Sequence, residues 1–79
     1  MKKTISEEHQ KRLRSIADYL KTARKYGEGY TQSELCKYLY LHRNTLQRAE
    51  SGKNITLLSL FELLDTLDIR PTELFNDIE

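Results

Sequence analysis

The scarcity of turn-forming residues is the feature that most restricts the fold of this chain. Only three glycines and one proline occur among its 79 residues, too few for the many tight turns of a β-sandwich or barrel. Leu, Lys, Glu and Arg, which are good helix formers, dominate instead. The length suffices for one domain whose core buries about 60% of the unfolded chain's surface. We therefore expect a single all-α domain.

Apolar residues recur at helical spacing in five segments, which predicts five helices. The first helix is expected at residues 5–25, with a capping box formed by Thr4 and Glu7 at its start. Two glycines then predict the turn that ends it. Residues 1–12 are almost wholly polar, so we expect a solvated helical extension there, rather than an arm that binds phosphates, and the domain proper at residues 13–79.

Each of the four shorter helices has recognisable end signals. Thr31 opens a second capping box, which predicts a helix that ends near Leu39. Gly52 suits the left-handed position just past the end of the third helix. Thr56 can cap the fourth helix, and Pro71 suits the first turn of the fifth. The fourth helix is the expected centre of the core, with an inward stripe of Leu57, Leu60, Phe61, Leu64 and Leu67, widened by Leu58 and Leu63.

The charge is unevenly distributed along the chain, although the net value is only +1. Residues 1–53 contain twelve Lys or Arg and six Asp or Glu, a net charge of +6. Residues 54–79 contain one Arg and six acidic residues, a net charge of −5. The basic part is therefore the expected nucleic-acid face.

The single cysteine and the absence of long apolar stretches bear on location. Cys36 has no partner for an intrachain disulfide, which fits a reducing cytoplasm, and its small size predicts a core position. No apolar stretch approaches the roughly 18 residues needed to cross a bilayer. Polar residues follow the basic start at Lys2 and Lys3, so export is not expected. We expect a cytoplasmic protein without a membrane partner.

The second and third helices resemble a known DNA-binding motif. Two short helices joined by a few residues, the second with a polar outer face, can place that second helix in a major groove. The motif is similar to the helix-turn-helix signature of the phage-repressor and Cro family, also called the XRE family. The similarity covers residues 13–78 and implies a lambda-repressor-like bundle of about five helices. It rests on Thr31-Gln32-x-x-Leu35-x-x-x-Leu39-x-Leu41 and on Thr45-Leu46-x-x-x-Glu50-x-Gly52-Lys53.

The resemblance assigns roles to particular residues. Arg suits the O6 and N7 atoms of guanine, and Asn or Gln suits the N6 and N7 atoms of adenine. It implies phosphate contacts for residues near the ends of the reading helix and at the start of the helix before it. The implied base contacts are Arg43, Asn44, Gln47 and Arg48, and the implied phosphate contacts are Gln32, His42 and Lys53.

The resemblance also implies an ion pair between Arg24 and Glu50 that ties the first helix to the third. The loop between the first two helices is one residue longer than usual, which makes Lys25 the alternative partner. Tyr40 stands where the family most often has glycine, so we expect the turn before the third helix to be strained or differently shaped.

The implied function is sequence-specific binding of double-stranded DNA by a repressor-like transcriptional regulator. It is expected to act as a homodimer through Leu74, Phe75 and Ile78, with a place in the core as the alternative for some of these residues. The alternative is a helix-turn-helix module for protein binding, such as the antitoxin of a toxin–antitoxin pair. Cys36, His9 and His42 form no catalytic or metal-binding constellation, so neither an enzyme nor a cofactor is expected.

Overall fold

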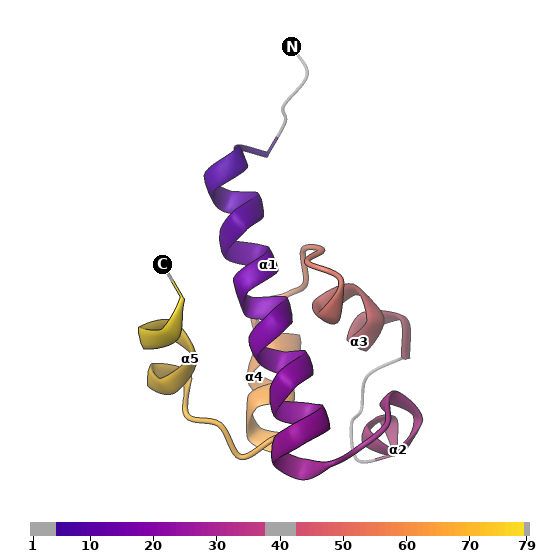
Figure 1. The fold of residues 1–79 in the computed structure, drawn as a ribbon. Coiled ribbons are helices and arrows are strands. Elements are labelled where there is room, and N and C mark those ends of the chain that lie inside the picture. Colours follow the sequence, from indigo (N-terminus) through magenta and orange to yellow (C-terminus); the bar gives the residue numbers. More distant parts are fainter. Residues whose placement is uncertain (1–4, 38–42, 79) are drawn as a thin grey trace.

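The computed structural model describes residues 5–37 and 43–78, which form five α-helices and one π-helical turn. No strand occurs within these two ranges. In Figure 1, α2 and α3 lie on one side of α1, and α5 lies on the other. The predicted all-α architecture is confirmed. The elements are α1 (Glu7–Thr22), the π-helical turn η1 (Ala23–Glu28), α2 (Gln32–Cys36), α3 (Arg43–Glu50), α4 (Leu57–Thr66) and α5 (Pro71–Asp77).

The start of α1 lies two residues later than predicted. Ser6 has an extended backbone, and its hydroxyl accepts a hydrogen bond from the N–H of His9 at 3.2 Å. Glu7 and Glu8 occupy the first turn, where negative charge stabilises the positive end of a helix. Ser6 therefore caps the helix in place of the predicted Thr4, which lies outside the described residues.

The end of α1 also differs from the prediction that the helix stops near Lys25. The chain continues as η1 through Gly27 and ends at Gly29, whose φ of +74° is left-handed. The N–H groups of Gly29 and Tyr30 both donate to the carbonyl of Arg24. A π turn contains about one residue more than an α turn. It accommodates the extra residue of this connection without changing the register of α1.

The core is built from leucines contributed by all five helices. These side chains are less than 2% exposed, and partly buried residues such as Cys36 and Ile55 pack against the cluster. Cys36 therefore lies at the edge of the core, close to the position predicted for it. The fully buried leucines are Leu20, Leu35, Leu46, Leu63, Leu64 and Leu74.

The buried face of α4 is rotated from the predicted one. Leu60, Leu63, Leu64 and Leu67 are buried and follow the i, i+3, i+4, i+7 spacing of one helix face. The inward positions predicted for Leu57 and Phe61, and the widening by Leu58, were wrong. The N-terminal half of α4 is apolar on several sides, so periodicity alone did not select the buried one. Leu57, Leu58 and Phe61 are 67%, 68% and 44% exposed.

In the C-terminal helix, one of the predicted dimer contacts is buried. Pro71 occupies the first turn of α5, as predicted. Leu74 is fully enclosed in the core and Ile78 packs against it, whereas Phe75 is 47% exposed. An enclosed side chain cannot contact a second subunit, so the prediction for Leu74 was wrong.

None of the helices within the described ranges is long and apolar enough to span a membrane.

Candidate nucleic-acid interface

A capping box fixes the start of α2. The hydroxyl of Thr31 accepts a hydrogen bond from the N–H of Glu34 at 3.1 Å, and the Glu34 carboxylate accepts one from the N–H of Thr31 at 3.0 Å. The bond from the Thr31 backbone is the main reason that the pKa of Glu34 is lowered, since it stabilises the charged carboxylate. The predicted capping box is confirmed. It places Gln32 in the first turn of α2.

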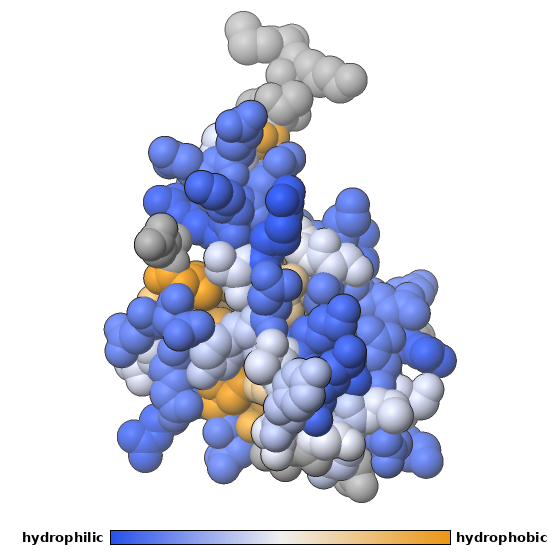
Figure 2. Space-filling model, viewed as in Figure 1, coloured by the Kyte–Doolittle hydropathy of each residue, from blue (hydrophilic) through white to orange (hydrophobic). Residues whose placement is uncertain are grey.

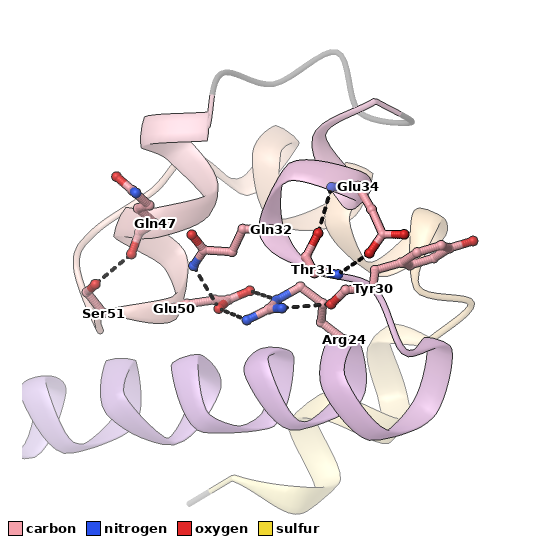
Figure 3. Close-up of polar contacts among 8 residues, drawn as sticks. All are labelled: Arg24, Tyr30, Thr31, Gln32, Glu34, Gln47, Glu50 and Ser51. Atoms are coloured by element: carbon pink, nitrogen blue, oxygen red, sulfur yellow. Dashed lines mark hydrogen bonds and ion pairs between the residues drawn. The ribbon is translucent and has the colours of Figure 1, made fainter.

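A buried ion pair joins η1, which follows α1, to the end of α3 (Figure 3). Nε and Nη2 of Arg24 donate to Oε2 and Oε1 of Glu50 at 2.6 and 2.8 Å. The two side chains are only 6% and 3% exposed. The hydrogen bond to Glu50 raises the pKa of Arg24. Glu50 is thus paired with Arg24, and the alternative partner Lys25 is exposed.

Two further hydrogen bonds connect this ion pair to α2. Nη1 of Arg24 donates to the carbonyl of Tyr30 at 2.7 Å, and Nε2 of Gln32 donates to Oε1 of Glu50 at 3.1 Å. These contacts join η1, the start of α2 and the end of α3 in a single arrangement (Figure 3). They fix the position of α3 relative to α2. We call Arg24, Tyr30, Gln32 and Glu50 the Glu50 network.

The outer face of α3 is polar and accessible. Leu46 and Ala49 anchor the opposite face in the core, where they are 1% and 3% exposed. Helical geometry then turns the intervening residues outward. All four residues predicted to contact bases are exposed, namely Arg43, Asn44, Gln47 and Arg48.

The C-terminal end of this face is bonded to the backbone around it. Nη2 of Arg48 donates to the carbonyl of Asn54 at 3.1 Å, and the hydroxyl of Ser51 donates to the carbonyl of Gln47 at 2.6 Å. Gly52 reverses the chain with a φ of +78°. A shallow hollow runs along this part of the surface, lined by Asn44, Gln47, Arg48, Ser51 and Lys53.

The three residues predicted to contact phosphates have different positions. Lys53 is exposed in the loop after α3, beside the hollow. Gln32 is half-buried, and its amide already donates to Glu50. His42 lies outside the described residues, as do Tyr40 and Leu39. Lys53 is therefore the member of this group that is placed openly on the surface.

Two contacts near the site were not anticipated from the sequence. One is the hydrogen bond from Gln32 to Glu50. The other is the packing of Gly52 against α1, where a Cβ at position 52 would lie 3.5 Å from both Cα and Cγ of Arg14. Each contact joins residues that are far apart in the chain, and residue spacing carries no signal for either of them.

The chemistry of the outer face matches that of base edges. Arg side chains donate hydrogen bonds, and Asn and Gln side chains both donate and accept them. These are the groups that distinguish guanine and adenine in a major groove. Across residues 5–37 and 43–78, no cluster of three or more His, Cys, Asp or Glu side chains could hold a metal ion.

A family comparison agrees with this arrangement. A helix-turn-helix family model matches residues 20–74, which is more than half of the chain. The matched segment begins within α1, includes the Glu50 network and the whole of α3, and ends within α5. No curated protein sequence matches the chain significantly.

Proposed function

Because the chain belongs to the helix-turn-helix family of the phage-repressor and Cro type, we propose that it binds double-stranded DNA sequence-specifically and represses transcription. DNA binding is what membership of this family implies. The observation that supports sequence reading is the outer face of α3, where arginine and amide side chains are exposed together and Leu46 and Ala49 hold the helix against the core.

The Glu50 network supports this proposal because a reading helix must be held rigidly. A small rotation of α3 would move its side chains out of hydrogen-bonding distance of the bases. The bidentate ion pair and the bond from Gln32 oppose such a rotation. We therefore assign the Gln32 side chain chiefly to this network. A phosphate contact of Gln32 would then come from its backbone N–H, or from its side-chain amide while that amide also donates to Glu50. Lys53, at the edge of the hollow, is assigned to a phosphate.

The proposed working form is a homodimer. A single short helix reads few base pairs, and two copies on half-sites about 34–36 Å apart provide the remaining affinity and specificity. Phe75 is the predicted dimer contact that stays exposed at 47%. Sedimentation of the parent and of Phe75→Ser should show a dimer weakened by the substitution. A parent that is monomeric both free and on DNA would contradict the homodimer.

The second candidate function is protein binding, as by an antitoxin that holds its toxin. The observation that favours it is the apolar outer side of α4, where Leu57 and Leu58 are about two-thirds exposed and Phe61 is 44% exposed. Monomeric proteins seldom expose adjacent large apolar side chains without a binding role.

The experiment that tests DNA reading is selection of bound sequences from a random duplex pool. The proposal predicts enrichment of a palindrome whose half-sites lie one helical turn apart. Binding to the selected duplex should weaken steeply between about 50 and 200 mM salt, because phosphate contacts release counterions. A pool that stays random, or an affinity independent of salt, would favour the protein-binding function instead.

A further inference from the structure

The N-terminal half of α1 is an ordered helix that extends past the rest of the domain. The helix begins at Glu7, is capped by Ser6, and is continuous to Thr22. Figure 1 shows its first turns projecting beyond the other helices, and Figure 2 shows that this projection is covered by hydrophilic side chains on the visible face. The family model starts only at residue 20, so it does not account for this segment.

The loop after α3 packs on this projecting part of α1. Gly52 lies so close to Arg14 that an added Cβ would be in van der Waals contact with the arginine backbone and Cγ. Lys53 follows directly, and Asn54 is held by the guanidinium of Arg48. The α1 helix at Arg14 is therefore directly adjacent to the loop that borders the outer face of α3.

The direction of α1 brings its N-terminal half to the same side as that outer face. In Figure 3, Gln47 and Ser51 lie at the end of the view toward which α1 runs to its N-terminus. At 1.5 Å per residue, the helix between Glu7 and Arg14 extends about 10 Å further in this direction. DNA that lies against α3 would thus run beside this part of α1.

The charges on this part of α1 suit a phosphate backbone. Lys11 and Arg14 are exposed and lie one turn apart on α1, and the backbone of Arg14 adjoins the loop that carries Lys53. Acidic residues also lie on this part of the surface: Glu7 and Glu8 occupy the capped first turn, and Glu8, Asp18 and Asp77 of α5 line the same hollow as Lys11 and Arg14. Lysine and arginine have long side chains that can reach past these shorter ones.

We propose that Arg14 and Lys11 bind the DNA phosphate backbone outside the base pairs that α3 reads. This inference rests on the proposed DNA binding and extends it, because it assigns a second contact surface that holds the flanking duplex. Together with Lys53, these two residues place three positive charges between the loop after α3 and the N-terminal half of α1. The base sequence of the flank is not read, since phosphate contacts carry no sequence information directly.

The test is a set of salt titrations with matched substitutions. Arg14→Gln and Lys11→Gln each remove one charge but keep the Cβ and Cγ atoms, so the packing of Gly52 on α1 is preserved. Arg70→Gln is the control, because Arg70 is also exposed and its side chain takes no part in capping α5. Affinity is measured for the selected duplex with long flanks and for a version trimmed to the half-sites. Thermal melting of each variant verifies that the fold is intact.

On the long duplex, each of the two substitutions should reduce the slope of log K against log salt by about 0.9. Arg70→Gln should leave the slope unchanged. Trimming the flanks should lower the slope of the parent by about 1.8 and that of each single variant by about 0.9, since each variant keeps the other flanking contact until the flank is removed.

Two other outcomes are separable. If the parent binds with a steep slope, and both variants keep that slope on the long duplex, the flanking contact is excluded while DNA reading by α3 stands. If the parent shows no salt-dependent binding to any duplex, the proposed DNA binding fails and the flanking contact fails with it.

Discussion

The Glu50 carboxylate holds two other segments against the end of α3, because the side chains of Arg24 and Gln32 both donate hydrogen bonds to it. The resemblance implied its pairing with Arg24, but the roles of the Tyr30 carbonyl and the Gln32 amide emerge only in three dimensions. Gln32 illustrates the difficulty, because a polar residue at a helix start suits a phosphate contact as well as an internal bond. The exposed positions of α3 were easier to predict, since helical periodicity alone turns them away from Leu46 and Ala49.

Replacing Arg24 tests the Glu50 network. Arg24→Ala leaves the Glu50 carboxylate buried without its cation and removes the donor to Tyr30. The free energy of unfolding should fall by about 3–5 kcal/mol. Urea denaturation measures this loss, with Lys25→Ala as the control because its exposed neighbouring charge should matter by less than about 0.5 kcal/mol.

A double substitution distinguishes the stability lost with the ion pair from the stability lost because the buried Glu50 charge is left unpaired. Arg24→Met with Glu50→Met should be more stable than Arg24→Ala alone, because no buried charge remains unpaired. An Arg24→Ala protein that melts within about a degree of the parent, where 1 kcal/mol corresponds to several degrees, would show that the ion pair contributes nothing.

At the level of helices, local end signals were predicted well and the choice of buried face was not. The caps at Thr31 and Thr56 and the left-handed Gly52 are properties of short segments, so the sequence specifies them. The π turn at η1 contains Arg24, whose partner Glu50 lies in another helix, so the signals within the segment did not predict it. The orientation of α4 likewise depends on packing against the other helices, which the apolar pattern of its first turns did not determine.

The capping box of α2 should make stability depend on pH. Because the pKa of Glu34 is lowered in the folded state, its contribution is fully present above the pKa of the unfolded chain, near 4.3. It is lost as the pH falls through the folded value. Glu34→Gln keeps a capping side chain without the charge. The stability difference between parent and variant, from urea denaturation, should therefore shrink as the pH is lowered from 7 to below about 4; a difference independent of pH would contradict this account.

Two glycines with different backbone conformations provide a matched comparison. Gly52→Ala should destabilise by about 1–2 kcal/mol, because its φ of +78° is unfavourable for a residue with a Cβ. Gly27→Ala should be neutral or stabilise by up to about 1 kcal/mol, since η1 is helical there and a Cβ meets no atom within 4 Å. Equal effects of the two substitutions on the melting temperature would be inconsistent with the described backbone.

At the level of the whole molecule, the two parts of the chain differ in charge and in the helices that they form. The basic residues 1–53 supply α1, α2 and α3, and the acidic residues 54–79 supply α4 and α5, with most of the core and the exposed Phe75. The charge division was visible in the sequence. The projection of α1 beside the outer face of α3 was not, because the direction of a helix relative to another follows from tertiary packing.

The central claim is that the outer face of α3 reads bases. Asn44→Ala should cost about 1–3 kcal/mol on the selected duplex and change binding to a scrambled duplex much less, because it removes a base contact and leaves the phosphate contacts in place. Asn76→Ala on α5 is the matched control, since it removes the same exposed amide from a different surface. The most direct measurement is therefore the ratio of affinities for the selected and scrambled duplexes at one salt concentration. Our account predicts that this ratio collapses for Asn44→Ala and is retained for Asn76→Ala, and an equal loss of affinity on both duplexes for Asn44→Ala would contradict it.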